Sequence, residues 1–191
     1  MDRASVIVSN MKRLFYVRHG ETEANVAELL SGNIETPLTK NGIQQAIATG
    51  KEIKERLPKV DLIICSPLGR AYETAKLIAQ EIDYPISKLQ KNDLLVERSY
   101  GVLERTSAKH FLKDGNYYLL DSIEQAETVE DLQKRAAKAF EYISQLDFDV
   151  ILIVAHGAFG RAMRRVANKQ PHTDEYKAFK QIPNAAIVEL V

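Results

Sequence analysis

The stretch DVILIVAHG, Asp149 to Gly157, has six consecutive aliphatic residues between an acidic residue and a histidine. A continuous run of this kind is typical of a strand that a parallel sheet buries on both faces. RLFYV (13 to 17) and VDLIICS (60 to 66) have the same apolar character, and AAIVELV (185 to 191) closes the chain with another such run. The sequence therefore predicts that these stretches are the buried strands of one sheet that contains residues 149 to 157.

Between these strands, apolar residues recur at helical spacing, and caps and prolines mark the helix ends. The helices are expected at 38 to 57, 69 to 82, 128 to 146 and 160 to 169, and 88 to 97 is expected to be extended. Strands that alternate with helices indicate an α/β fold. We expect a three-layer α/β/α sandwich with a mainly parallel central sheet.

The length of 191 residues fits a single domain that spans the chain. Residues 1 to 10 are expected to form a loose extension before the first strand. Residues 99 to 127 have no clean period, and their place before a helix predicts an insertion that covers the substrate.

The composition excludes several kinds of partner. Lys plus Arg and Asp plus Glu are 26 each, so no net field attracts nucleic acid or an anionic membrane. The basic stretch RAMRR (161 to 165) is expected to be a solvated helix face. One cysteine and the lack of an 18-residue apolar stretch predict a soluble cytoplasmic protein.

Polar side chains follow the predicted strands at the points where these end. They are Arg18, His19 and Gly20, then Ser66 and Arg70, then Glu97 and Arg98, and finally His156 and Gly157. In open α/β sheets, ligands bind outside the carboxyl ends of the strands. We therefore expect these side chains to meet at one edge of the sheet.

Such a cluster is positively charged on a chain without net charge, which favours a phosphate site. A phosphomonoester dianion matches the guanidinium fork and the start of a helix. His19 adds a neutral nitrogen that can take a phosphoryl group and pass it to water. Glu97 adds a general acid for the departing alkoxide.

These residues also carry a family resemblance. RHGETEAN (18 to 25) resembles the signature of the histidine phosphatase superfamily, the phosphoglycerate mutase-like proteins. Further blocks resemble that family in the same order along nearly the whole chain: Ser31-Gly32, TPLTKNGIQQA (36 to 46), CSPLGRAYETA (65 to 75), ERSYGVLE (97 to 104), VAHG (154 to 157) and PNAAIVEL (183 to 190). Dispersed motifs in order are more specific than one short pattern.

The resemblance implies a role for each matching residue. His19 would be the nucleophile and Glu97 the proton donor, while Arg18, Arg70 and His156 would bind the phosphoryl oxygens. Asn25 would add a side-chain donor and Gly157 a backbone donor. The rest of the substrate would contact Ser31, Gly32, Arg98 and Tyr100. The family implies no metal and no cofactor.

Two departures from the family bear on the reaction. Where family members often read GVLEG, this chain reads GVLER, so a glycine after Glu104 is either deleted or replaced by Arg105. Mutases also have a longer central insertion with an arginine pair and prolines, and residues 99 to 127 have neither. The chain thus resembles the shorter phosphatase branch.

We expect a metal-independent phosphomonoesterase that acts on a small phosphorylated metabolite through a phosphohistidine. A cofactor-dependent phosphoglycerate mutase and a non-catalytic phosphate-binding module stay open as alternatives. Cysteine chemistry is disfavoured, because only four residues separate Cys65 from Arg70 and Pro67 removes an N–H donor. His110 and His172 are expected at the surface, and the protein is expected to be a monomer or a homodimer.

Overall fold

The structure, a computed structural model, describes residues 12–57, 59–107, 109, 112–113, 116–117, 122–170 and 181–191. Its centre is a five-stranded sheet in the order β3-β2-β6-β1-β7. The strands are β1 (Arg13–Arg18), β2 (Leu62–Cys65), β3 (Gln90–Lys91), β6 (Val150–Ala155) and β7 (Ile187–Glu189). All neighbours are parallel except β7, which runs antiparallel to β1. This confirms the mainly parallel sheet.

The register of the sheet brings the chemically important residues together. Arg18 of β1 lies beside Ala155 of β6, so His19 and His156 leave the sheet next to each other. Cys65 of β2 lies beside Val154 of β6, so Ser66 lies next to His156, on the side away from His19. Because the central strands are parallel, all three chains emerge at the same edge of the sheet.

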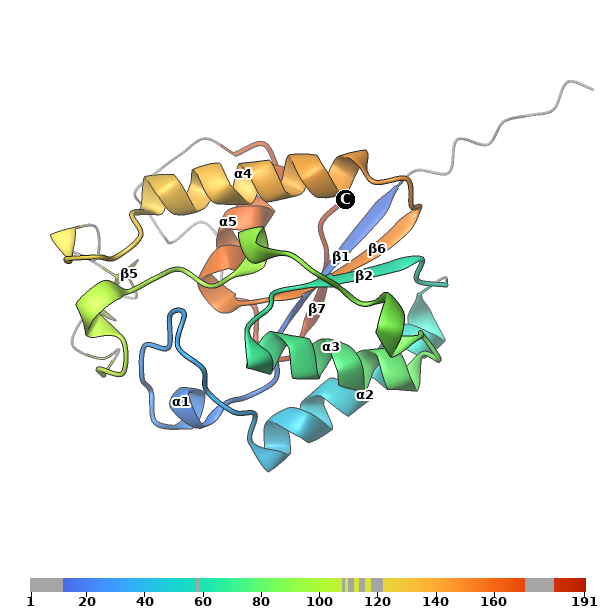
Figure 1. The fold of residues 1–191 in the computed structure, drawn as a ribbon, viewed down its shortest axis with the longest axis horizontal. Coiled ribbons are helices and arrows are strands. Elements are labelled where there is room, and N and C mark those ends of the chain that lie inside the picture. Colours follow the sequence, from blue (N-terminus) through green and yellow to red (C-terminus); the bar gives the residue numbers. More distant parts are fainter. Residues whose placement is uncertain are drawn as a thin grey trace, which may run out of the picture.

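Two helices cover each face of the sheet (Figure 1). On one face, α2 (Lys40–Arg56) and α3 (Gly69–Glu81) pack against the alternate strand residues that include Phe15, Val17, Ile63 and Leu152. On the other face, α4 (Val129–Gln145) and α5 (Gly157–Ala167) pack against the set that includes Leu14, Tyr16, Ile64 and Ile153. The two faces bury separate cores, so the three-layer sandwich is confirmed.

The predicted strand at 88 to 97 is mostly wrong. Only Gln90–Lys91 pairs with the sheet, and it is flanked by the 3₁₀ turns η1 (Ile86–Lys88) and η2 (Asp93–Leu95). The Asn92 side chain accepts the N–H of Leu94 at 2.9 Å and thereby starts η2. An Asn that binds the backbone two residues ahead favours a turn over a strand.

Two other element boundaries differ from the sequence prediction. α5 starts at Gly157, directly after His156, rather than at Gly160. A short helix, α1 (Glu23–Val26), follows the first strand, and a capping box between Thr22 and Asn25 holds it. Both changes affect the site, because each places a backbone N–H or a side chain near His19.

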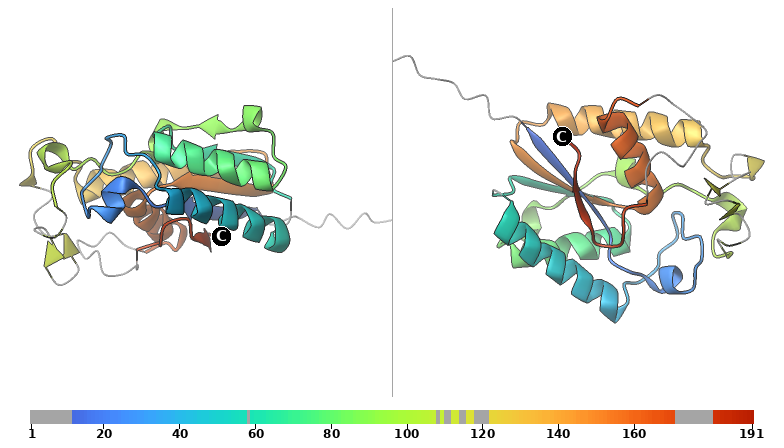
Figure 2. Two further views of the ribbon diagram at one scale, coloured as in Figure 1. Left: turned by 90° about the horizontal axis from the view of Figure 1, so that it is seen from below. Right: turned by 180° about the vertical axis from the view of Figure 1, so that it is seen from behind.

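Residues 99 to 127 are described in part. They contain η3 (Gly101–Leu103) and a hairpin of β4 (Leu112–Lys113) and β5 (Asn116–Tyr117). This segment and α1 lie at the end of the molecule toward which β1 and β6 run (Figures 1 and 2). The predicted extension at 1 to 10 and the predicted surface residues His110 and His172 lie outside the described residues.

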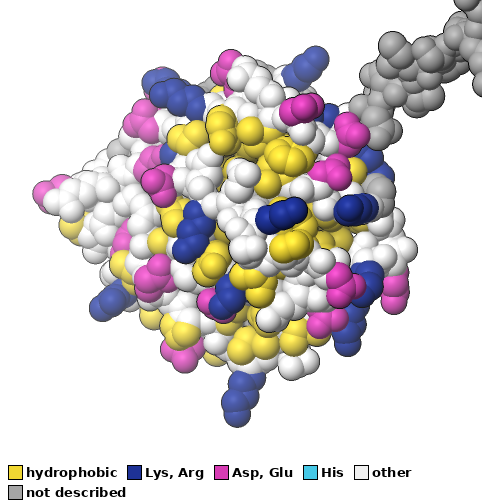
Figure 3. Space-filling view, turned by 45° about the vertical axis from the view of Figure 1, so that its right-hand side comes forward, with side chains coloured by type: hydrophobic (Ala, Val, Ile, Leu, Met, Phe, Trp, Pro, Cys, Tyr) yellow, Lys and Arg dark blue, Asp and Glu magenta, His cyan; other side chains and the backbone are white. Residues whose placement is uncertain are grey.

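Charged side chains of both signs are mixed on the face shown in Figure 3, without a large patch of one sign. This pattern agrees with the equal numbers of acidic and basic residues. Among the described residues, no helix has the length and apolarity that a membrane crossing requires.

Candidate active site

His19 sits directly after β1 with its ring fixed by the next residue. Its side chain is only 4% exposed. Nδ1 lies 2.7 Å from the carbonyl oxygen of Gly20, and because a carbonyl only accepts, Nδ1 carries the proton and donates it. Nε2 therefore keeps its lone pair. Burial lowers the pKa of His19 well below 6.5, and the Arg70 and Arg18 cations lower it further, so the ring is neutral at neutral pH.

His156 is the N-cap residue of α5 and is fully buried behind His19. The two rings are 5.2 Å apart between centroids and meet edge to face. Nε2 of His156 lies 2.8 Å from Oγ of Ser66. Burial, with Arg70 next in importance, lowers the pKa of His156 well below 6.5. The site thus contains two neutral imidazoles.

Arg18 and Arg70 are each tethered to backbone carbonyls. Arg18 donates to Ile182 O at 3.0 Å, and Arg70 donates to Ile34 O at 2.8 Å and to Gly32 O at 2.7 Å. Glu73, three residues after Arg70 on α3, pairs with Lys76 and not with Arg70. Both guanidinium groups are therefore held in place without a direct carboxylate partner among the described residues.

Three buried nitrogens of this cluster have no hydrogen-bond partner among the described residues: Nε of Arg18, Nε of Arg70 and Nδ1 of His156. An unsatisfied buried donor costs about 1–3 kcal/mol, so each needs an explanation. A phosphate dianion bound at His19 would provide acceptors for all three. The donor set therefore fits the phosphate site that the sequence predicted.

Glu97 is bound through its carboxylate to the start of α5. Oε1 accepts the N–H groups of Arg98 and Phe159, both at 2.9 Å, and Oε2 accepts that of Ala158 at 3.0 Å. Oε2 receives one such bond and keeps a lone pair for a proton. Because α5 begins right after His156, one helix fixes both His156 and Glu97.

A cavity of about 320 Å³ opens in front of His19. Arg18, Arg70 and Glu97 line it, and so do four predicted substrate contacts: Asn25, Ser31, Gly32 and Tyr100. Asn25 Oδ1 accepts from Thr22 N and from Asn184 Nδ2, so its amide nitrogen is the part left to face the cavity. These placements support the predicted substrate-binding roles.

Three predicted residues do not line this cavity: His156, which is fully buried against His19, and Arg98 and Gly157. Arg98 is fully buried and donates from Nε to Glu127 O at 2.8 Å, away from the cavity, so its predicted substrate contact is not supported. Gly157 is buried as the first residue of α5, and an added Cβ would lie 3.3 Å from Arg18 Nε. This close approach to Arg18 explains why the residue is a glycine. It does not show a backbone contact to the substrate.

Several supporting residues were not predicted from the sequence. Tyr16 hydroxyl donates to His156 O at 2.6 Å and accepts from His156 N at 2.8 Å. Thr74 accepts from Gly20 N, and Asn184 donates to His19 O. Tyr16 and Thr74 lie on faces that a helix or strand pattern assigns to the core, so only Asn184, in the block PNAAIVEL, carried a signal.

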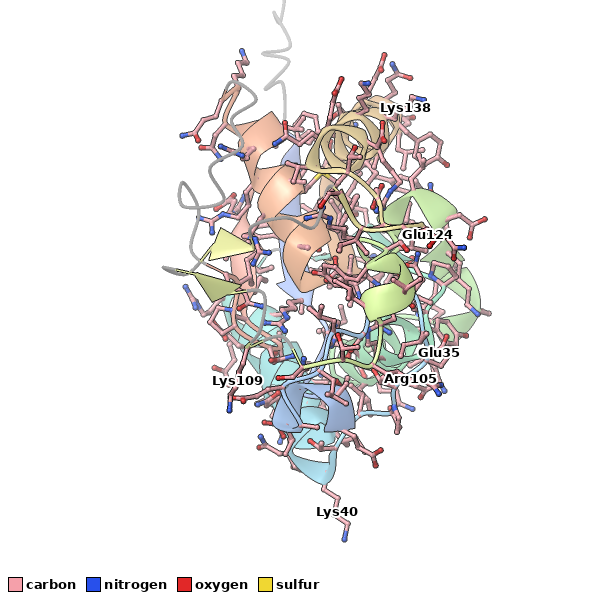
Figure 4. The ribbon with its side chains drawn as sticks, turned by 90° about the vertical axis from the view of Figure 1, so that its left-hand side faces the viewer. Glu35, Lys40, Arg105, Lys109, Glu124 and Lys138 are labelled. Carbon is pink, nitrogen blue, oxygen red and sulfur yellow. The ribbon has the colours of Figure 1, made fainter. Side chains whose placement is uncertain are left out.

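Lys109 and Arg161 also line the cavity, and neither was predicted there from the sequence. The prediction that 161 to 165 form a solvated helix face is wrong, because Arg161 is half-buried at the cavity and Arg165 is buried. Lys109 forms an ion pair with Glu28, which comes from the loop after α1. Figure 4 shows Lys109 close to α1 at this end of the molecule. Both charges of the pair are more than half exposed, so the pair lies at the mouth of the cavity.

The backbone at Arg105 favours replacement of the glycine over its deletion. Arg105 has φ +69°, the left-handed conformation that favours glycine, so the loop keeps a glycine-type backbone with arginine in it. Glu104 Oε1 accepts the N–H groups of Asn33 at 3.1 Å and Tyr100 at 3.2 Å. This carboxylate joins two segments of the cavity wall.

Cys65 is fully buried on the face of the sheet opposite to α5. Burial raises the pKa of its thiol to about 11. The thiol stays protonated at neutral pH, and a thiol is a poor nucleophile. This agrees with the interpretation of Cys65 as a core residue.

Comparisons with known proteins agree with this site. Residues 14–191 match the model of the histidine phosphatase superfamily (branch 1). The chain is 32% identical over 158 residues to putative phosphoserine phosphatase 2 of Hydrogenobacter thermophilus, covering 77% of this chain and 74% of that protein. It is 31% identical over 163 residues to the 2,3-bisphosphoglycerate-dependent phosphoglycerate mutase of Bartonella bacilliformis, covering 80% and 79%.

Solved structures give the same result. YhfR of Bacillus stearothermophilus superposes with a TM-score of 0.80 at 25% identity, covering 93% of this chain and 90% of that one. The α-ribazole phosphatase of Shigella flexneri gives 0.76 at 26% identity, covering 93% and 89%. Named relatives are thus phosphatases or mutases, which supports an enzyme. The chain belongs to the histidine phosphatase superfamily.

Proposed function

We propose that the protein is a metal-independent phosphomonoesterase that acts on small phosphorylated metabolites through a phosphohistidine on His19. The observation that carries this proposal is the set of unpartnered buried nitrogens of Arg18, Arg70 and His156 around a neutral imidazole. Donors that are fixed in advance stabilise the charge of a phosphoryl group in transfer. The phosphatases among the relatives support the same reaction class.

In the first half-reaction, Nε2 of His19 attacks phosphorus. The N–P bond forms with the lone pair that the Gly20 contact leaves on Nε2, and the P–O ester bond breaks. The electron pair leaves with the alcohol oxygen, which takes a proton from Glu97. Arg18, Arg70 and His156 Nδ1 hold the phosphoryl oxygens throughout.

In the second half-reaction, water attacks phosphorus on the side from which the alcohol departed. Glu97, now a carboxylate, takes the proton of the water. The N–P bond breaks, its electron pair returns to Nε2, and phosphate leaves. Glu97 is protonated again, so the cycle is closed without an external acid or a metal ion.

A panel of phosphomonoesters, assayed for phosphate release in the presence of EDTA, tests this proposal. We expect that EDTA does not change the turnover. Both Glu97→Gln and His19→Gln should reduce it. No phosphate release from any ester, or full activity in His19→Gln, would contradict it. The same panel identifies the substrate, because phosphoserine and α-ribazole phosphate are esters named for relatives.

A mutase is the second candidate, because the Bartonella relative is similar over four-fifths of this chain. The resemblance associates prolines and an arginine pair in this region with mutases. Residues 99 to 127 have no proline and no arginine pair, so we favour hydrolysis. Conversion of 3-phosphoglycerate to 2-phosphoglycerate, followed beside phosphate release, separates the two. Isomerisation faster than release would make the mutase the correct assignment.

A further inference from the structure

Arg135 on α4 binds the backbone of the segment that carries Glu97. Nη1 donates to Leu94 O at 2.9 Å and to Val96 O at 2.8 Å, and Nη2 lies 3.3 Å from Glu97 O. This segment begins in η2 and, among the residues that the structure describes, pairs with no strand of the sheet. One guanidinium therefore supplies the donors that a neighbouring strand would otherwise give to its carbonyls.

A carboxylate fixes this guanidinium from the other side. Glu127 accepts from Arg135 Nε at 2.8 Å and from Nη2 at 2.7 Å, in a bidentate pair whose side chains are each 16% exposed. Such paired bonds are short and directional, and lysine cannot reproduce their geometry. The arginine is thus held in one position by its partner rather than by packing alone.

Arg135 also contacts the structure that binds the Glu97 carboxylate. Its guanidinium lies over the Phe159 ring, 5.0 Å from the centroid. The N–H of Phe159 donates to Glu97 Oε1 at 2.9 Å. The same guanidinium therefore touches the backbone of the acid and the ring of a residue that holds its carboxylate.

We infer that Arg135 is a positioning residue for Glu97, which it holds at the place where a proton passes to the leaving alcohol. The inference rests on the proposed phosphatase reaction. General acid catalysis requires hydrogen-bond reach, and a misplacement of about 1 Å can cost about 10²-fold in rate. Arg135 itself does not line the cavity, so it can act on the reaction only through the residues that it contacts, of which Glu97 lines the cavity.

Leaving-group dependence tests this inference. An alkyl phosphate such as β-glycerol phosphate needs a general acid, whereas p-nitrophenyl phosphate has a good leaving group and needs one far less. In Arg135→Lys we expect kcat/KM, which reports the half-reaction in which the alcohol leaves, to fall about 10²-fold for the alkyl ester and much less for the aryl ester. An equal loss on both esters would overturn the inference.

Two further variants control for damage to the fold. Lys138→Met changes an exposed cation one turn along the same helix (Figure 4) and should leave both esters unaffected. Glu127→Gln keeps an acceptor oxygen but removes the charge, so it should show the same selective loss to a smaller degree. If Arg135→Lys does not fold, an unselective loss in Glu127→Gln overturns the inference.

A double variant shows where Arg135 acts. If it acts through the acid, Arg135→Lys should cost nothing further on the alkyl ester in a Glu97→Gln background. A loss that multiplies in the double variant would overturn the inference. If the unaltered protein releases phosphate from neither ester, the proposed function itself fails, which is a different outcome.

Discussion

The hydroxyl of Ser66 lies 2.8 Å from Nε2 of His156 and decides which nitrogen of that ring carries the proton. Ser66 is fully buried and its O–H has no other acceptor among the described residues, so we infer that it donates to Nε2 while Oγ accepts the N–H of Leu68 at 3.3 Å. Nδ1 of His156 then carries the proton and becomes a donor toward the phosphoryl group. The contact converts a buried imidazole into a defined hydrogen-bond donor.

Removal of this hydroxyl should weaken catalysis without abolishing it. In Ser66→Ala, His156 loses the bond that selects its tautomer, and the loss of about 1–1.5 kcal/mol predicts a decrease of about tenfold in kcat. Steady-state kinetics with p-nitrophenyl phosphate measures it. Cys65→Ala is the matched control, because Cys65 is the last residue of β2, directly before Ser66, and packs in the core on the α2 and α3 side of the sheet.

Arg70→Lys should be far more damaging. Lysine keeps the charge but cannot hold Gly32 O and Ile34 O while it presents a third nitrogen to the phosphate. We expect kcat to fall about 10²–10³-fold, as for the loss of one fixed transition-state donor. The exposed Arg56→Lys on α2 should have no effect, and a change of less than threefold in Arg70→Lys would contradict the role.

The pH dependence follows from the buried histidines. His19 must be neutral to attack, and burial holds its pKa well below 6.5, so lowering the pH through 6.5 does not protonate the nucleophile. The pKa of His156 is also lowered, mainly by burial. The acidic limb of kcat/KM, which reports the free enzyme, should have its midpoint clearly below 6.5. A midpoint at or above 6.5 would contradict the geometry around His19.

Arg105 offers a test that concerns stability rather than chemistry. A non-glycine residue in the left-handed conformation is strained, so Arg105→Gly should stabilise the fold by up to about 1 kcal/mol. Glycine also makes the unfolded chain more flexible, which offsets part of the gain. Thermal unfolding should show a modest rise in Tm with unchanged turnover. A clear fall in Tm would mean that the arginine side chain has a stabilising contact.

The central residues could be predicted because strand ends in a parallel sheet meet at one edge. His19 and His156 each follow an apolar run, and the register of Arg18 with Ala155 places them side by side as expected. Glu97 also lines the cavity as its motif predicts, although a turn at Asn92 replaces most of the strand predicted before it.

The supporting contacts could not be read from the sequence. Arg135 appears in a helix with many charges, and nothing in its pattern shows that three backbone carbonyls surround it. Arg98 follows Glu97 in the motif but turns to Glu127 O. Such differences depend on how loops cross the ends of helices, which local sequence patterns do not determine.

The most direct test of the account is the position of the phosphoryl group during turnover. Rapid mixing with labelled substrate, denaturation at alkaline pH and peptide mass spectrometry locate it, and ³¹P NMR distinguishes the two ring nitrogens. We predict phosphate on Nε2 of His19, since Nδ1 is bound to Gly20 O, and none in His19→Gln. A phosphoryl group on Cys65 or His156, on Nδ1 of His19, or on no residue during active turnover would contradict it.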